Sequence, residues 1–266
     1  MTAGDPGMSP PKTPFHKLTL GPEATEAPQI IWLHGWGQTH ASLLPLAELM
    51  EKRATNILFD LPGFGKTERL ERGAASPEYA AAVAAELTPL PAGRRLIVGH
   101  SFGCRVALRL AAGWPELVGG LVLIAPAGLP RRRSVLWRGR AVGLKLSGRM
   151  ARFADRLLGS RLHDRFAVRF GSADYRNAGP LRESFVKIVN EDLSEVARQI
   201  SQPVAILVGE ADTETPPEIS RRYAQLIENA GLVVLPGFGH LDILSRGRHQ
   251  LEARLSRFLE EHGFGH

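Results

Sequence analysis

Short, continuous runs of apolar residues recur along the chain, and most of them end in a glycine-rich or proline-rich turn. The runs are Ile30–Leu33, Ile57–Phe59, Leu96–Val98, Leu121–Ile124, Val204–Val208 and Leu232–Leu235, with His16–Leu20 as a further, shorter candidate. They are continuous rather than alternating, which is typical of strands buried on both faces of a parallel sheet. The pattern therefore predicts a mostly parallel sheet.

Helical patterns lie between most of these strands. They cover Leu43–Arg53, Tyr79–Leu87, Phe102–Ala112 and Gln250–Glu261. Alternating strands and helices indicate a doubly wound α/β fold. One stretch departs from this rhythm, because from Gly128 to Gln202 there is helical spacing but no convincing strand. We expect a helical cap there, inserted after the sixth strand, Leu121–Ala125.

This pattern divides the 266 residues into a mobile N-terminal tail (1–14), an α/β core (15–127 and 203–266) and the cap insertion (128–202). A single core with one insertion is compatible with this length. The tail has no apolar leader segment, and the longest apolar run, Leu121–Ala127, is far shorter than the roughly 20 residues that cross a bilayer. With Cys104 as the only cysteine, no disulfide can form within the chain. We expect a cytoplasmic protein.

One motif carries specific chemistry. Gly99-His100-Ser101-Phe102-Gly103 matches G-x-S-x-G, directly after the Leu96–Val98 strand and directly before a helical pattern. A nucleophilic serine on such a tight strand-to-helix turn needs glycine two residues away on each side, because larger side chains would collide. The following helix points its N-terminus at the reacting centre and favours developing negative charge there. Ser101 is therefore the candidate nucleophile.

Other turns strengthen this interpretation. Leu33-His34-Gly35-Trp36-Gly37 follows the first core strand, Asp60-Leu61-Pro62-Gly63-Phe64-Gly65 follows the second, and Gly209-Glu210-Ala211-Asp212 and Gly237-Phe238-Gly239-His240 follow the last two. With the serine turn, these motifs make the chain resemble the α/β-hydrolase superfamily from about Gln29 onward. The resemblance implies a Ser…Asp…His triad in that chain order. It also implies an oxyanion hole formed by the backbone N–H groups of Trp36 and Phe102.

The positions of the residues agree with that triad. Of the nine histidines, His240 is the best base, because its glycine-rich loop lies at the same sheet edge as Ser101. Asp212 follows the preceding strand and would orient the base, with Glu210 and Glu214 as competitors. Some superfamily members carry the acid one strand earlier, where this chain reads Ala125-Pro126-Ala127. The candidates for lining the substrate pocket are Trp36, His34, His100 and Leu241.

Two other motifs do not indicate further chemistry. Gly65-Lys66-Thr67 resembles the end of a phosphate-binding loop, but the earlier glycine that such a loop requires is replaced by Asp60. No His, Cys and carboxylate set has metal-ligand spacing, so we expect neither a metal nor a cofactor. Cys104 is expected to be a small packed residue.

The positive charge is concentrated in the expected cap. Between Gly128 and Gly171 there are eleven arginines and one lysine against two aspartates, in a chain whose net charge is +6. Arg149, Arg152 and Arg156 share one helical face, opposite Leu146, Met150, Phe153 and Leu157. Such a helix has three interpretations: a solvated outer face, contact with an anionic membrane surface, or steering of an anionic substrate. Nucleic-acid binding has no supporting motif.

These features favour a serine hydrolase that cleaves a carboxylic ester of a small-molecule acyl substrate through an acyl-enzyme. The same triad could also cleave a carbon–carbon or other acyl bond. In a different class, the fold could serve as a catalytically silent binding protein. The complete set of Ser101, Asp212 and His240 argues against a silent protein.

Overall fold

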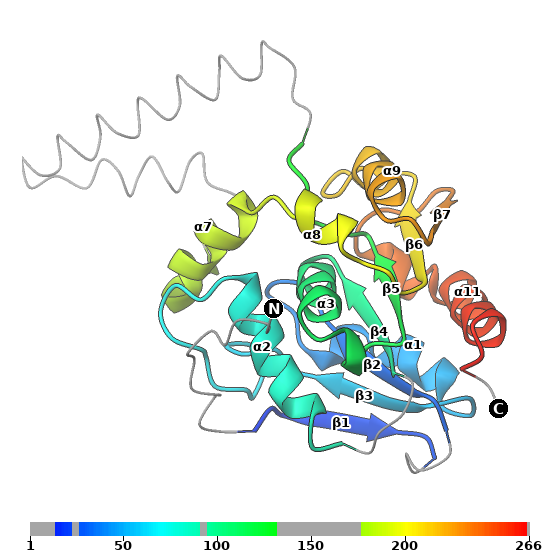
Figure 1. Cartoon of the computed structure of the whole chain (residues 1–266), viewed down its shortest axis with the longest axis horizontal. Helices are drawn as coiled ribbons and strands as arrows, with labels where there is room; N and C mark the ends of the chain where they lie inside the picture. Colours follow the sequence, from blue (N-terminus) through cyan, green and yellow to red (C-terminus); the bar gives the residue numbers. More distant parts are fainter. Residues whose placement is uncertain (1–13, 23–26, 91–94, 132–176, 265–266) are drawn as a thin grey trace, which may run out of the picture.

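The computed structural model describes residues 14–22, 27–90, 95–131 and 177–264. Within these ranges the chain forms one seven-stranded sheet with helices on both faces (Figure 1). The strands are β1 (Lys17–Leu20), β2 (Gln29–Leu33), β3 (Thr55–Phe59), β4 (Arg95–His100), β5 (Gly120–Ile124), β6 (Val204–Gly209) and β7 (Ala230–Leu235). Every expected apolar run overlaps one of them, which confirms the strand prediction.

The strands are arranged in the order β1-β3-β2-β4-β5-β6-β7. All neighbouring pairs are parallel except β1 and β3, which are antiparallel. Strands β2, β3, β4 and β5 are buried at every position, which explains their continuous apolar sequences. Because the carboxyl ends of parallel strands meet at one edge, the loops after β2, β4, β6 and β7 lie at that edge together.

The helices form two layers, one on each face of the sheet. One layer contains α2 (Ser76–Leu87), α3 (Phe102–Gly113), α8 (Ser194–Arg198) and α9 (Pro217–Leu226). The other contains α1 (Leu44–Ala47), α10 (Asp242–Ser245) and α11 (Arg248–Glu261). Alternate residues of a strand enter opposite cores, so Ile31 packs in the first core and Ile30 in the second.

Two helices differ from the sequence pattern. The single helix expected over Leu43–Arg53 is wrong in extent: α1 covers only Leu44–Ala47, between the 3-10 turns η1 (His40–Ser42) and η2 (Glu48–Met50). Helix α9 was not expected, because it has a narrow apolar face in which only Ile219 and Tyr223 are buried large side chains. Its start is marked by Pro217 in the first turn, a position that proline tolerates.

The described part of the expected cap contains helices. These are the 3-10 turn η4 (Gly179–Leu181), α7 (Arg182–Asn190) and α8. The strand before this segment, β5, is the fifth among the described residues rather than the sixth, because β1 alone precedes β2. The arginine-rich run from Arg132 and the expected helix around Met150 lie outside the described residues, so the division into core and cap stays a prediction. No described helix is both long enough and apolar enough to span a membrane.

Candidate active site

The turn between β4 and α3 holds Ser101 in an unusual conformation. Its φ is +50° and its ψ −104°, a combination that residues other than glycine rarely adopt. The Ser101 N–H donates to the Ile124 carbonyl of β5 at 3.0 Å. A Cβ at Gly103 would overlap the Leu33 carbonyl, and one at Gly99 would lie 2.7 Å from the Gly103 backbone. The close backbone approach therefore requires both glycines, as the motif predicts.

Two backbone N–H groups near this turn have no acceptor. Neither the Trp36 nor the Phe102 N–H is hydrogen-bonded within the part of the chain that the structure describes. Phe102 is the first residue of α3, where helix N–H groups lack intrahelical partners. The Trp36 ring packs against Phe64 and Phe185, with centroid distances of 5.0 and 5.2 Å. The geometry therefore leaves two donors available beside Ser101.

His240 and Asp212 come together at the same sheet edge. His240 Nδ1 lies 2.8 Å from Asp212 Oδ2, and the two residues are only 8% and 3% exposed. The other oxygen, Oδ1, accepts the backbone N–H groups of Glu214 and Thr215, each at 2.8 Å. Because an ionised carboxylate can only accept hydrogen bonds, Nδ1 carries the proton of the neutral imidazole. His240 Nε2 is then the ring nitrogen that can accept a proton.

The environment of Asp212 keeps its carboxyl group ionised. Burial raises its pKa, but hydrogen bonds from His240 and Thr215 and the charge of protonated His240 outweigh burial. The net effect holds the Asp212 pKa below its usual value of 3.8. At neutral pH, a negative charge therefore stands beside His240.

Thr215 adds a contact that the sequence pattern did not indicate. Its Oγ1 lies 2.9 Å from Asp212 Oδ2, 3.0 Å from the Ala125 carbonyl oxygen and 3.2 Å from His240 Nδ1. Thr215 is buried, and its hydroxyl links the loop after β6 to the end of β5. The only sequence signal is its place three residues after Asp212, within reach of a carboxylate that accepts local backbone N–H groups.

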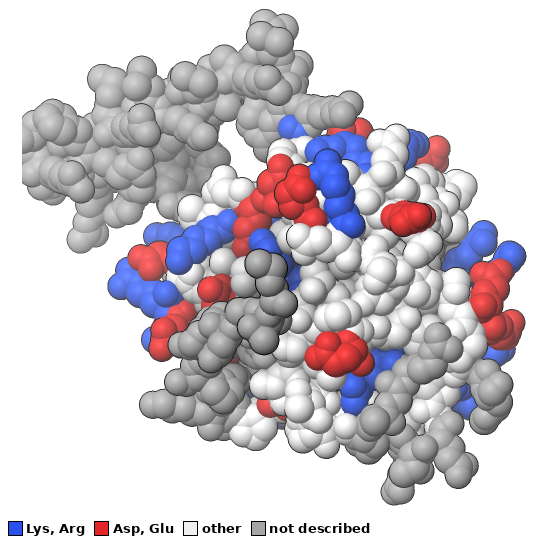
Figure 2. Space-filling model, in the orientation of Figure 1, with Lys and Arg blue, Asp and Glu red and all other residues white. Residues whose placement is uncertain are grey.

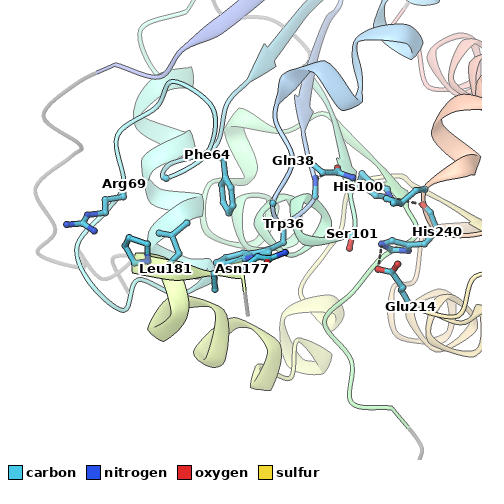
Figure 3. A pocket seen from close by; sticks show the side chains of 16 residues that line it. Trp36, Gln38, Phe64, Arg69, His100, Ser101, Asn177, Leu181, Glu214 and His240 are labelled. Atoms are coloured by element: carbon cyan, nitrogen blue, oxygen red, sulfur yellow. Dashed lines mark hydrogen bonds and ion pairs between the residues drawn. The ribbon is translucent and has the colours of Figure 1, made fainter. Parts of the chain in front are cut away.

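The second nitrogen of His240 lies near another acid. Nε2 is 3.6 Å from Glu214 Oε2, and the Glu214 side chain is 60% exposed. Ser101, His240 and Glu214 line the same pocket, but among the described residues no hydrogen bond joins Ser101 to His240 (Figure 3). Such bonds are often long without substrate. The structure thus brings the three residues together without closing the Ser101–His240 hydrogen bond.

Two cavities meet at Ser101. The larger one, of about 860 Å³, extends from Ser101 and His240 toward Arg69 and Leu181 (Figure 3). The smaller one, of about 180 Å³, shares Ser101, Trp36 and Glu214 with it. Leu241, which is 56% exposed, lines the larger cavity. Trp36 and Leu241, two of the candidates for the pocket lining, therefore border a cavity that also reaches Ser101.

The two histidines proposed for the pocket have structural contacts. His100 borders the larger cavity but is fully buried, with Nε2 3.1 Å from the His240 carbonyl oxygen. Burial lowers its pKa to about 3, so its ring is neutral. His34, the other candidate, lines neither of the two cavities. His34 is fully buried, and its Nε2 accepts the Leu61 N–H at 2.9 Å while Nδ1 contacts the Gly35 carbonyl at 2.7 Å.

The fold also gathers a cluster that sequence spacing did not indicate. His16, His40 and Asp60 offer ligand atoms within 4.8 Å of one another. However, Asp60 Oδ1 accepts the backbone N–H of His40 and lies 2.8 Å from Nδ1 of the His40 ring. The other oxygen, Asp60 Oδ2, accepts the Lys66 N–H at 3.0 Å. Both carboxylate oxygens are therefore already hydrogen-bonded, and the cluster joins the loops at this edge of the sheet.

Comparison with known proteins places the chain in a family. The profile of the alpha/beta hydrolase fold matches residues 28–246. The chain belongs to this family of hydrolases.

Its relatives include proteins named for esterase or hydrolase activity. The chain is 29% identical over 259 residues to the pimeloyl-[acyl-carrier protein] methyl ester esterase of Chromobacterium violaceum, covering 92% of this chain and 96% of that protein. It is 26% identical over 231 residues to the 2-(acetamidomethylene)succinate hydrolase of Mesorhizobium japonicum, covering 82% and 83%. A solved structure of a thermophilic esterase from Thermogutta terrifontis is similar with a TM-score of 0.66 and 20% identity, covering 93% of each chain. That structural likeness shows a common fold.

Proposed function

We propose that the protein is a serine hydrolase that cleaves carboxylic esters through an acyl-enzyme. One observation carries the proposal: Ser101, on its strained turn, shares a cavity with His240, whose Nδ1 is hydrogen-bonded to the buried Asp212. The chain order Ser, Asp, His is that of α/β hydrolases. The relative named as a methyl ester esterase supports an ester as the substrate.

The proposed reaction begins with proton transfer from the Ser101 hydroxyl to His240 Nε2. Ser101 Oγ attacks the ester carbonyl carbon, and Asp212 stabilises the imidazolium that results. The N–H groups of Trp36 and Phe102 bind the oxyanion of the tetrahedral intermediate. As the intermediate collapses, His240 returns the proton to the leaving alcohol. Water then attacks the acyl-enzyme with His240 as base, which releases the acid and restores Ser101.

A fluorophosphonate probe tests the nucleophile directly. The wild type should be labelled in the native state, whereas Ser101→Ala should not be labelled. Equal labelling of both proteins would exclude Ser101 as the nucleophile. The heat-denatured wild type is the control for non-specific reaction.

The bond that is cleaved is tested with p-nitrophenyl esters of short and longer acyl chains. We expect turnover that disappears in Ser101→Ala. A labelled Ser101 without turnover of any ester would contradict the ester substrate and favour a carbon–carbon or other acyl bond. Absence of both labelling and turnover would favour a non-catalytic binding protein.

The acid of the triad is tested by paired substitutions. Asp212→Asn should lower kcat on the order of 10⁴-fold, because it removes the charge that stabilises the imidazolium. Glu214→Gln should lower it by less than about 10-fold, because the Glu214 side chain is 60% exposed and solvent screens its charge. The reverse order of effects would assign the role to Glu214.

A further inference from the structure

The smaller cavity beside Ser101 contains a buried arginine. Arg105 is only 8% exposed and lines this cavity together with Ser101 and Trp36. It stands four residues after Ser101, within the first turns of α3. Four residues along an α-helix span about 6 Å, so the side chain starts one helical turn from the nucleophile.

Arg105 carries a donor without a partner. Its Nη1 atom is buried and has no hydrogen-bond partner among the described residues. The nearest carboxylate oxygen, Glu191 Oε2, is 3.9 Å away, which is too long for a hydrogen bond. The two Glu191 oxygens instead accept the Ser76 N–H at 2.9 Å and the Ser76 hydroxyl at 2.5 Å. Glu191 therefore directs its hydrogen bonds to the start of α2 and faces Arg105 as a charge partner at 3.9 Å.

A buried guanidinium group with an unused donor is costly unless a ligand supplies the acceptor. Burial lowers the pKa of Arg105, yet an arginine remains protonated in proteins. The missing hydrogen-bond partner is therefore an acceptor, and an anionic acceptor would add to the charge balance that Glu191 provides at 3.9 Å. A carboxylate suits a guanidinium group best, since two parallel hydrogen bonds can form.

The rest of the cavity accepts a carbon chain. Its walls include apolar side chains from α3, α7 and the segment after β5, namely Phe102, Ala127, Phe185, Ile188 and Val189. The other ionisable residue on the wall is Glu214, whose exposed side chain lies beside His240. Solvent screens this exposed charge, whereas Arg105 is shielded from solvent. On the described surface drawn in Figure 2, positive and negative side chains are interspersed. Arg105 therefore differs from the surface arginines by its burial, and not by belonging to a positively charged patch.

The volume of the cavity indicates room for a short chain. A cavity of about 180 Å³ corresponds to roughly six water-sized groups, at about 30 Å³ for each water. This space suits two or three methylene groups followed by a carboxylate. The larger cavity, which also reaches Ser101, then remains for the alcohol.

We propose that the smaller cavity is the acyl subsite and that Arg105 binds the free carboxylate of a short dicarboxylic acid monoester. The inference rests on the proposed function, since it specifies the acyl group of the ester that Ser101 attacks. In the bound state, Arg105 pairs with the carboxylate at one end of the acyl chain, and the ester carbonyl at the other end reaches Ser101.

The test compares two methyl esters of nearly equal shape. Monomethyl succinate carries the carboxylate, whereas methyl 4-methylpentanoate has an uncharged branched end in its place. We expect the wild-type kcat/KM to be about 10- to 100-fold higher for monomethyl succinate, which corresponds to a charged hydrogen-bonded pair. Release of methanol measures both reactions.

Substitution at Arg105 then assigns the preference. In Arg105→Met the ratio of the two kcat/KM values should fall to one or below. Arg109→Met is the matched control, because Arg109 lies one turn further along α3 and lines neither cavity. It should keep the wild-type ratio. If Arg105→Met does not fold, Arg105→Lys, which keeps the charge but not the paired donors, should lower the ratio.

The outcomes separate this inference from the proposed function. A wild type whose Ser101 is labelled by the fluorophosphonate but which shows no preference for monomethyl succinate would overturn the carboxylate subsite alone. An unchanged ratio in Arg105→Met would do the same. A wild type that is neither labelled nor active on either ester would overturn both proposals.

Discussion

Replacing Thr215 with valine removes one hydroxyl group from the site and leaves the shape of the side chain nearly unchanged. That hydroxyl contacts Asp212 Oδ2 at 2.9 Å and the Ala125 carbonyl oxygen at 3.0 Å. After the change, Asp212 keeps three donors: the His240 ring and the backbone N–H groups of Glu214 and residue 215. The carboxylate would therefore stay ionised but less firmly oriented.

The magnitude follows from these contacts. A hydrogen bond to a charged group contributes about 1.5–3 kcal/mol. We therefore expect the free energy of unfolding of Thr215→Val to fall by about 2 kcal/mol and its Tm by about 4–8 °C. Because Asp212 still holds His240, kcat should decrease by only about 10-fold, corresponding to about 1.4 kcal/mol in the activation barrier.

Thermal unfolding and steady-state hydrolysis of p-nitrophenyl acetate measure the two effects. Thr215→Ser keeps the hydroxyl and loses the methyl group, so it should recover most of the wild-type kcat. If Thr215 acted only by packing its methyl group, Thr215→Ser would not recover kcat. Wild-type kcat and Tm in Thr215→Val would refute a positioning role. A loss as large as that of Asp212→Asn would also contradict the reasoning, because it would mean that the hydroxyl alone holds the carboxylate.

Three further predictions follow from buried contacts. Gly103→Ala should not accumulate as soluble protein, because the new Cβ would overlap the Leu33 carbonyl. Gly113→Ala on the same helix is the control and should accumulate normally, because nothing lies within 4 Å of its Cβ. Equal soluble yields of the two variants would argue against the steric reasoning. Asp60→Asn should lower the free energy of unfolding by about 2–3 kcal/mol at pH 7. Burial raises the Asp60 pKa, but hydrogen bonds outweigh burial and hold the pKa in the folded protein below 3.8. The stabilisation is therefore fully present above pH 3.8 and is lost as the pH falls through the pKa of the folded protein. Urea unfolding should show the difference between variant and wild type shrinking at acid pH, and a constant difference would count against it. Cys104 is fully buried and burial raises its pKa, so iodoacetamide should modify it only after denaturation; rapid modification of the native protein would show that the thiol is accessible.

Sequence alone determined the framework of this protein. A strand buried on both faces must be apolar at every position, so β2 to β5 are visible as continuous runs. The turn at Ser101 is visible as a motif, because Gly99 is needed by backbone atoms of the next few residues and Gly103 by the Leu33 carbonyl on the adjacent strand β2. The order of strands and loops then places Ser101, Asp212 and His240 at one edge of a parallel sheet.

Only the tertiary structure decided the contacts between distant segments. His34 was a candidate for lining the pocket but is buried against the loop after β3. The hydrophobic pattern of the sequence does not distinguish a pocket-lining position from a buried one. Thr215 and Arg105 have ordinary sequence surroundings, and their roles depend on which atoms the fold brings near them. Hydrophobic patterning reports whether a residue is buried and on which face of its element. Hydrogen bonds depend on atoms within about 3 Å, and only the packing of helices and loops against the sheet sets those distances.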